Sequence, residues 1–408
     1  MNSKEAQALL ADSEVLFTAD QVNAATTNVA KALNRDYADR HPLVLGVMGG
    51  AVAQHLACRG AQVIALDQFS FPHDRGSSHG ETRNIRQAVY ENPAYVPLLK
   101  RAFDLWQELA AGTGRPLMRL TGRVMMGRPD GSVIRGALAS ADRFGLPVER
   151  LSPDEIRRRF PMFAPRDDMV GLYEARAGVL FAETCVGAQH DAARAAGATL
   201  RFDEALLDWR STAGGLEIRT TRDRYAASQL ILATGAWLPA LVPGLPLWVE
   251  RQVLCWFEPR ARPESFAPDR CPIYLFQIAP DWSLYGVQLF GDGIKVARHH
   301  GGERCTPDSV RRSVDASDVE PVRAAVERYL PDAAGPFLRS RVCLYTNTPD
   351  LHFIIDRHSS DERVLLVSSC SGHGFKFAPA IGEAVAQLAL DGSSAVDLSF
   401  FRLARFQS

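Results

Sequence analysis

A short apolar run followed at once by a glycine-rich turn constrains this chain more than any other feature. Residues Pro42–Leu45 predict a strand, Gly46–Gly50 a turn and Ala51–Arg59 a helix. Val63–Leu66 then predicts a second strand, which ends at Asp67. This order is typical of a unit that binds a dinucleotide: a strand, a glycine turn, a helix, a second strand and an acidic residue.

The glycines of this turn depart from the usual GxGxxG pattern at one position. Counting back from Asp67 places Val44, Gly46 and Gly49 at the three glycine positions. The second glycine lets the backbone approach a pyrophosphate, and the third lets the helix pack close to the strand. Valine is stiff and disfavours a positive φ at the first position. The motif therefore predicts a nucleotide site with an altered phosphate loop, and a glycine turn in another kind of α/β protein is the alternative for this segment alone.

Composition excludes several classes of protein. The 408 residues suggest two or three domains, and the net charge of −1 favours neither nucleic acid nor an anionic membrane as a partner. The seven cysteines are scattered without a CxxC pair, so we expect no disulfide framework and no metal site. We expect a cytoplasmic protein, since these cysteines fit a reducing compartment and no secretory signal is visible. The apolar stretch at 230–249 is broken by glycines and prolines and predicts a buried strand and a loop, not a membrane span.

From Ala51 almost to its end the chain resembles the monomeric sarcosine and N-methyltryptophan oxidases. The motifs that carry the resemblance are Gly76–Arg86, Gly178–Phe181, Ala233–Trp237, Val342–Tyr345, Phe353–Asp356, Ser371–Phe377 and Asp397–Gln407. The resemblance implies an α/β fold, with an FAD-binding, Rossmann-like domain of the D-amino-acid/sarcosine oxidase type and a second, mixed-sheet substrate domain. It also implies a discontinuous FAD-binding domain at 41–117, 172–245 and 338–408 and a substrate domain at 118–171 and 246–337. Before them, the helical spacing of Val22, Ala25, Val29 and Leu33 predicts a helical N-terminal extension at 1–40.

The first residues resemble a different family. Ser13–Val22 and Asp36–Ala51 are similar to the start of bacterial hypoxanthine-guanine phosphoribosyltransferases, in which the Gly49-Gly50 turn would help to hold pyrophosphate. The resemblance stops near Ala51, and no later segment matches the acidic pair and Thr-Gly-rich loop that grip phosphoribosyl pyrophosphate. We interpret the chain as composite, with the join in the phosphate loop, and a transferase remnant remains an alternative.

The oxidase resemblance implies FAD as the cofactor, because no amino-acid side chain accepts a hydride reversibly. Cys343 matches the cysteine that joins the flavin through a thioether, and a buried apolar cysteine is the alternative role. The other implied cofactor contacts are Gly46, Gly49, Asp67, His79, Arg83, Gly235, Trp237, Gly372, Gly374, Phe375 and Lys376.

The resemblance also implies residues for the substrate and for oxygen. Arg86 and Lys376 match positions that bind the substrate carboxylate, and Tyr345 matches a pocket position. A guanidinium offers two parallel donors and an ammonium adds a point charge, which suits an amino-acid anion. Lys295 matches the lysine that activates oxygen, where a fixed cation would stabilise the charge of superoxide. The implied catalytic set is Lys295, Arg83, His299 and Tyr345.

Together these residues predict oxidation of a secondary N-methyl amino acid to an imine. Hydrolysis then gives formaldehyde and the demethylated amino acid, while oxygen is reduced to hydrogen peroxide. Sarcosine, N-methyltryptophan, pipecolate and proline all stay open as substrates, and Cys255–Phe257 predicts an aromatic wall that favours a larger side chain. The resemblance implies a monomer. An inactive or FAD-poor oxidase is the alternative, if Val44 weakens the phosphate loop.

Overall fold

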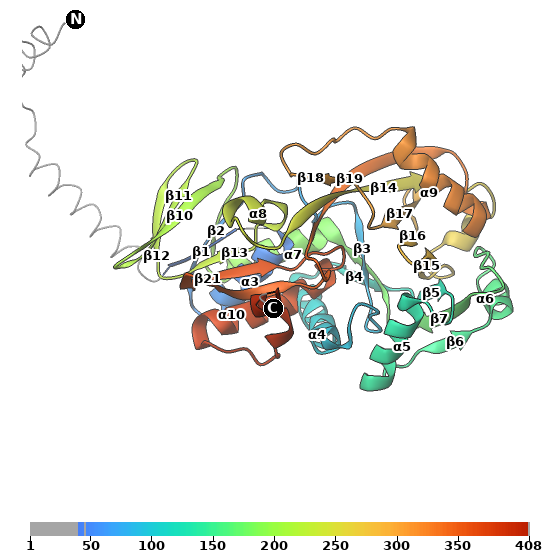
Figure 1. Cartoon of the computed structure of the whole chain (residues 1–408), viewed down its shortest axis with the longest axis horizontal. Coiled ribbons are helices and arrows are strands. Elements are labelled where there is room, and N and C mark those ends of the chain that lie inside the picture. The colour runs from blue at the N-terminus through green and yellow to red at the C-terminus, as the bar shows by residue number, and fades with distance from the viewer. Residues whose placement is uncertain (1–39, 45, 407–408) are drawn as a thin grey trace, which may run out of the picture.

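The chain folds into two lobes, each built around its own β-sheet (Figure 1). The computed structural model describes residues 40–44, as backbone only, and residues 46–406. The predicted helical extension at 1–40 and most of the transferase-like segment lie outside the described residues. From Arg40 onward the chain enters the first sheet.

The first lobe contains a six-stranded sheet with five parallel strands and one antiparallel edge strand. In spatial order the strands are β20 (Ile354–His358), β21 (Asp361–Ser368), β13 (Leu230–Leu232), β1 (Arg40–Val44), β2 (Gln62–Leu66) and β9 (Thr199–Arg201). The strand predicted at 42–45 is therefore an interior strand of this sheet, and the strand predicted at 63–66 is its neighbour β2. Val44 pairs with Leu66, so the altered glycine position falls at the end of an extended strand.

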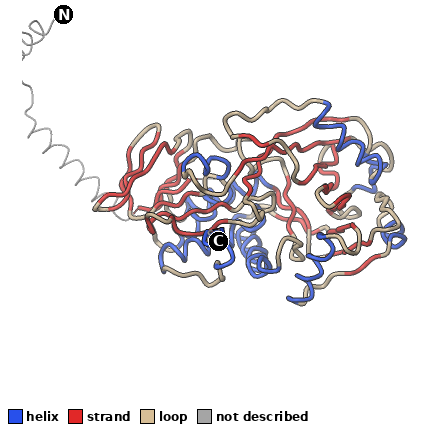
Figure 2. Tube along the Cα trace, viewed as in Figure 1, coloured by secondary structure: helices blue, strands red, loops and turns tan. Residues whose placement is uncertain are grey.

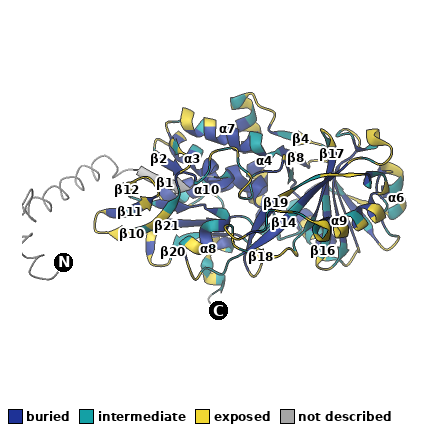
Figure 3. Ribbon diagram, turned by 90° about the horizontal axis from the view of Figure 1, so that it is seen from above, coloured by how far each residue is buried: buried dark blue, intermediate teal, exposed yellow. Residues whose placement is uncertain are grey.

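Helices cover one face of this sheet and a small antiparallel sheet covers the other (Figures 1 and 2). The helices are α3 (Val47–Cys58), α4 (Val96–Thr113), α7 (Ala182–Ala195) and α10 (Ala378–Asp391), and the small sheet is β10 (Leu206–Thr212), β11 (Gly215–Thr220) and β12 (Arg224–Ala227). Leu216 and Ile218 of β11 share an apolar core with Leu66 and Leu232 of the large sheet. Burial on both faces explains why the strand predicted at 63–66 is a continuous apolar run (Figure 3).

The second lobe is a mixed, nine-stranded sheet. Its strands are β18 (Arg304–Cys305), β14 (Trp248–Phe257), β17 (Gly293–His299), β16 (Trp282–Phe290), β15 (Ile273–Ala279), β5 (Arg123–Gly127), β7 (Val170–Glu174) and β6 (Glu149–Leu151), with β19 (Phe337–Asn347) paired to β14. The helices of this lobe are α5 (Ser132–Phe144), α6 (Pro153–Arg159) and α9 (Ala316–Tyr329). The domain boundaries at single-residue level stay a prediction.

Alternation along the strands gives the two faces of this sheet different roles. In β17, Ile294 and Val296 point into the apolar core that α9 covers. Lys295 and His299 lie on the opposite face, because successive side chains of a strand point to opposite sides. That opposite face looks toward the first lobe.

The aromatic wall predicted at Cys255–Phe257 is wrong. Cys255 and Phe257 point into the core beneath α9, away from the first lobe. Trp256 points the other way, but it packs with Leu254 and Ala297 and does not line the cavity described below. The strand period of two divides the three residues between two faces, which a short apolar run in a sequence does not reveal.

A three-stranded sheet connects the two lobes (Figure 1). It consists of β3 (Thr82–Ile85), β8 (Gly178–Phe181) and β4 (Met118–Leu120). The segment at 76–86 passes into β3, which carries Arg83, and Arg86 follows its end. Two short helical turns, η2 (Gly235–Trp237) and η5 (Phe375–Phe377), lie where the first lobe meets the second.

Candidate active site

A cavity of about 380 Å³ lies between the two lobes. One side is lined by residues that follow the strands of the six-stranded sheet, and the other by the inner face of the nine-stranded sheet. The volume falls in the range of small-molecule sites, which often lie between domains.

The carboxyl ends of four parallel strands meet at the first side of the cavity. Gly46 follows β1, Asp67 follows β2, Thr234 follows β13 and Ser369 follows β21, and all four residues line the cavity. Ligands of open α/β sheets bind at this edge. Gly46 has a φ of 116°, which a residue with a side chain would disfavour, and it is the N-cap of α3. The N-terminus of α3 is thus directed at the cavity, as a pyrophosphate requires.

Several buried polar atoms on the cavity wall have no hydrogen-bond partner among the described residues. They include Thr234 Oγ1, Ser369 Oγ and Asn84 Oδ1. Burying a polar atom without a partner costs about 1–3 kcal/mol. The wall is therefore complementary to a ligand that carries many polar groups.

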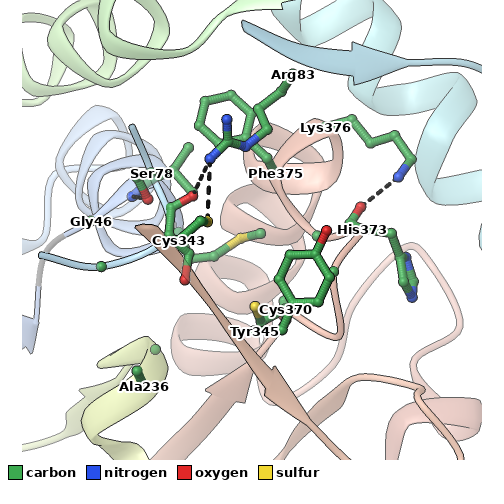
Figure 4. Close-up of a pocket in the computed structure, with 18 of the residues that line it drawn as sticks. Gly46, Ser78, Arg83, Ala236, Cys343, Tyr345, Cys370, His373, Phe375 and Lys376 are labelled. Atoms are coloured by element: carbon green, nitrogen blue, oxygen red, sulfur yellow. Dashed lines mark hydrogen bonds between the residues drawn. The ribbon is translucent and has the colours of Figure 1, made fainter. Parts of the chain in front are cut away.

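Arg83 and Cys343 come together deep in the cavity (Figure 4). Arg83 Nη2 donates to Cys343 Sγ at 3.7 Å and to the carbonyl oxygen of Ser77 at 2.8 Å. The guanidinium also lies 5.8 Å from the centre of the Phe375 ring. These contacts fix a cation beside a buried thiol that faces the cavity.

Lys295 lies on the inner face of the nine-stranded sheet, close to Arg83. Its Nζ donates to the carbonyl oxygens of Gly80 and Thr82, each at 2.7 Å. Burial and the nearby Arg83 lower the pKa of Lys295 well below its ordinary value. The charge on this buried amine therefore depends on pH in a range where a surface lysine stays protonated.

A second group of cations lines another part of the cavity. Arg86 and Glu91 form a buried ion pair. Lys376 donates from Nζ to the carbonyl oxygen of His373, and Trp106 Nε1 donates to the carbonyl oxygen of Lys376 at 2.9 Å. Burial and Arg86 lower the pKa of Lys376 well below its ordinary value. Arg86 Nη1 and Glu91 Oε2 have no hydrogen-bond partner in the described part of the chain, so the pair keeps capacity for a further ligand.

The turn that carries Phe375 and Lys376 depends on close packing of its backbone. A Cβ on Gly374 would lie 1.7 Å from the carbonyl oxygen of Ser369, which is closer than any real contact. A Cβ on Gly372 would lie 2.6 Å from the Tyr345 ring. Small residues here allow η5 to lie against the ends of β21 and β19.

Histidine and tyrosine side chains complete the wall. His299 Nδ1 lies 3.3 Å from the hydroxyl of Tyr345, and their rings meet edge to face. Burial lowers the pKa of His299 well below its ordinary value, and burial raises the pKa of Tyr285 to about 12. At neutral pH this part of the wall therefore holds a neutral imidazole and neutral phenols.

The cavity brings together most of the residues predicted from the sequence. Those that line it are Gly46, Asp67, Arg83, Arg86, Gly235, Trp237, Lys295, His299, Cys343, Tyr345, Gly372, Gly374, Phe375 and Lys376. Gly49 does not line it, since it lies buried within α3. His79 also lies outside the lining, with Nε2 3.1 Å from the carbonyl oxygen of Gly76.

Other lining residues were not anticipated. They include Tyr90, Glu91, Arg123, Tyr285 and Cys370. Only Arg123 has a signal in the sequence, because it is the one charged residue of β5, whose other residues are apolar or glycine. A charge at the start of a buried strand indicates a partner or a ligand.

Comparison with known proteins identifies the cofactor class. A family model described as "FAD dependent oxidoreductase" matches residues 45–388.

The chain belongs to this family.

This oxidoreductase is 43% identical over 363 residues to "Monomeric sarcosine oxidase" of Streptomyces avermitilis, covering 88% of this chain and 94% of that protein. It is 34% identical over 364 residues to "N-methyl-L-tryptophan oxidase" of Yersinia pestis, covering 89% of this chain and 97% of that protein. The same fold occurs in NikD, an amino acid oxidase of nikkomycin biosynthesis, with a TM-score of 0.79, 23% identity and coverage of 89% and 96%. It also occurs in glycine oxidase from Geobacillus kaustophilus, with a TM-score of 0.74, 21% identity and coverage of 90% and 98%.

The cavity of this oxidoreductase fits FAD. Gly46 and the start of α3 suit a pyrophosphate, Asp67 suits ribose hydroxyls, and the unpartnered Thr234 and Ser369 hydroxyls can bond the cofactor.

Within the described ranges we find no cluster of three or more potential metal ligands. No helix in the same ranges has the length and apolar character needed to span a membrane.

Proposed function

We propose that this oxidoreductase demethylates N-methyl amino acids. One secondary N-methyl amino acid, one oxygen and one water would give the demethylated amino acid, formaldehyde and hydrogen peroxide. The observation that carries the proposal is a single cavity that holds a cation pair for a carboxylate, Arg86 and Lys376, together with Cys343 and Lys295. The names of the relatives at 43% and 34% identity support the same substrate class.

The cations at Arg86 and Lys376 would bind the substrate carboxylate. Arg86 Nη1 has no hydrogen-bond partner among the described residues, while Nη2 stays paired with Glu91. A carboxylate would offset the desolvation that lowers the Lys376 pKa, because it pairs with the ammonium form. Two fixed cations would thus orient the amino acid, and its N-methyl group would extend toward Arg83 and Lys295.

Bound FAD would accept the hydride equivalent that leaves the C–N bond. The amine must be uncharged to release it, and the neutral His299 and the phenols of Tyr285 and Tyr345 place no fixed negative charge beside it. None of these three side chains is a carboxylate, and Glu91 on the same cavity wall is paired with Arg86, so none of the three pairs with the ammonium form of the amine. These three residues would therefore favour the reactive amine.

Lys295 would serve the oxygen half of the reaction. Reduction of oxygen begins with a developing negative charge, which a buried ammonium stabilises strongly. Its two carbonyl acceptors, on Gly80 and Thr82, fix the amine in place before oxygen arrives. The role depends on the protonated form of Lys295.

Cys343 would hold the cofactor covalently. Replacing the S–H bond and one C–H bond of the flavin 8α-methyl group by an S–C bond removes two electrons and two protons, which oxygen can take up. Cys343 is buried on the cavity wall beside Arg83, and the cation attracts the thiolate that forms the bond. Such a link would hold FAD even where the phosphate loop is weak.

The test is an absorption spectrum before and after acid precipitation, followed by a peroxide assay with N-methyl amino acids. Yellow colour in the pellet and peroxide with sarcosine or a larger N-methyl amino acid support the proposal. A flavin-loaded protein that oxidises none of them overturns it. The alternative of an FAD-poor protein is tested by measuring the FAD bound to Val44→Gly and to the parent. A large rise in the variant would show that Val44 limits cofactor binding.

We also propose that the protein is a monomer, which size-exclusion chromatography tests.

A further inference from the structure

A further cation, Arg123, lies in the cavity beyond those that the proposed function uses. Arg123 begins β5 and pairs across the sheet with Glu174 of β7 and Ile273 of β15. Only 1% of its surface is exposed, and it lines the cavity. A fully buried arginine is rare unless an anion meets it.

No anion of the described part of the chain meets this guanidinium. Its Nε and Nη1 atoms are buried and have no hydrogen-bond partner within the described ranges. The Glu174 carboxylate accepts the backbone N–H groups of Gln87 at 2.6 Å and Ala88 at 3.2 Å. Glu91 is paired with Arg86. The two carboxylates whose charges act on Arg123 therefore already have partners of their own.

Arg123 keeps its charge without an ion-pair partner among the described residues. Burial and the like charge of Arg86 lower the pKa of Arg123 to about 9, so it remains a cation at neutral pH. Burial raises the pKa of Glu174, and its carboxylate is held by two backbone N–H groups and not by Arg123. A buried cation without a direct ion-pair partner is costly, and a negatively charged ligand that contacts the guanidinium would relieve that cost.

Arg123 lies near the proposed carboxylate site but does not coincide with it. The Arg86 guanidinium is 4.8 Å from the centre of the Tyr90 ring, and the Arg123 guanidinium is 6.0 Å from the same centre. All three side chains line the cavity. One small molecule can therefore contact both arginines.

We infer that Arg123 binds a second carboxylate of the substrate, so that the preferred substrates are N-methyl amino acids with an acidic side chain. The inference rests on the proposed function and narrows its substrate class. Arg86 and Lys376 would bind the main-chain carboxylate, and Arg123 the side-chain carboxylate. A bidentate contact from a guanidinium would distinguish this group from a neutral amide of the same shape.

The first experiment compares N-methyl-L-glutamate with N-methyl-L-glutamine, which have nearly the same shape. We expect kcat/KM of the parent enzyme to favour the acid roughly 10- to 100-fold, the effect of a hydrogen bond to a charged group. Arg123→Met should abolish this ratio and Arg123→Lys should restore part of it. Arg128→Met is the matched control, because Arg128 is exposed on the same segment and does not line the cavity; its ratio should equal that of the parent. Equal kcat/KM for acid and amide in the parent overturns the inference.

A binding measurement that needs no reaction tests the inference separately from the proposed function. Calorimetric titration of the flavin-loaded enzyme should show that succinate binds more tightly than propionate. Arg123→Met should remove this difference in affinity. If no N-methyl amino acid is oxidised but succinate binds through Arg123, the proposed function fails and the dicarboxylate site stands. If sarcosine is oxidised and succinate shows no preference, the function stands and the inference is overturned.

Discussion

Arg83 Nη2 lies 3.7 Å from Sγ of Cys343, although 260 residues separate the two in the chain. Arg83 comes from β3 of the connecting sheet and Cys343 from β19 of the second lobe. The contact requires that both lobes have formed and docked. The proposed cofactor attachment is therefore a property of the assembled fold and not of a local motif.

Replacing Cys343 tests which thiol holds the flavin, because a second cysteine also lines the cavity. Cys343→Ala should release all yellow colour to the supernatant after acid precipitation, whereas Cys370→Ala should keep it in the pellet. The opposite result would assign the link to Cys370, whose Sγ accepts the backbone N–H of Thr346 at 3.3 Å. Arg83→Met should slow attachment, since the thiolate loses its adjacent cation.

Lys295→Met should slow the reaction of the reduced enzyme with oxygen by about 10²–10³-fold, the effect of removing a stabilising group from a developing anion. Reduction by substrate under anaerobic conditions should change far less. Stopped-flow absorbance measures the two half-reactions separately. Lys100→Met, at an exposed position, is the control. Equal losses in both half-reactions would contradict an oxygen-specific role.

The same lysine gives a pH dependence with a definite sign. Burial and Arg83 lower the Lys295 pKa, so the ammonium is present below this lowered pKa and is lost as pH rises through it. The oxygen reaction of the parent enzyme should therefore slow with rising pH, at a pH below the ordinary lysine pKa. In Lys295→Met the rate of the oxygen reaction should no longer depend on pH in this range. If the rate still falls with rising pH, the dependence belongs to another group.

Glu91→Gln should have two opposite effects. Carboxylate inhibitors should bind more tightly, because Glu91 no longer competes for Arg86. Unfolding should become easier by roughly 3–5 kcal/mol, because a buried cation loses its partner. Thermal melting and calorimetric titration with acetate measure the two effects. If Glu91→Gln neither tightens inhibitor binding nor lowers stability, the ion pair with Glu91 does not restrain Arg86.

Acid titration gives a second measure of this ion pair. Burial would raise the Glu91 pKa, but Arg86 and other cations hold it well below its ordinary value. The pair therefore stabilises the fold above the ordinary glutamate pKa, and that stability is lost as pH falls through the folded-state pKa. Glu91→Gln should flatten the acid limb of the melting curve relative to the parent.

The fold of the first lobe was predictable, because its signals are local. The apolar run before Gly46 and the one before Asp67 became two adjacent parallel strands, β1 and β2. The motifs around Arg86 and Lys376 also pointed to one site, and the cavity gathers them. Local pattern and resemblance agreed at these positions.

The rest depended on contacts that a sequence pattern does not contain. Glu91 follows the motif at 76–86 by only five residues, but its pairing with Arg86 depends on how the loop folds back. Tyr285 reaches the cavity because the alternation of β16 turns it inward, and Cys255 fails to reach it because the alternation of β14 turns it outward. Strand periodicity is known before the structure, but which face becomes the cavity wall is decided by how the lobes dock.

Gly374→Ala tests whether the turn before η5 depends on close backbone approach. The added Cβ would lie 1.7 Å from the carbonyl oxygen of Ser369, so the turn must move and take Phe375 and Lys376 with it. We expect a loss of several kcal/mol of stability, as for other overpacked buried sites, together with weaker substrate binding.

Gly112→Ala is the matched control, because Gly112 lies within α4 with no atom close to an added Cβ. That change should be neutral or stabilise the protein by up to about 1 kcal/mol, since alanine favours a helix. Thermal melting of both variants decides the matter: equal melting temperatures would mean that the turn adapts, and that its position does not depend on Gly374.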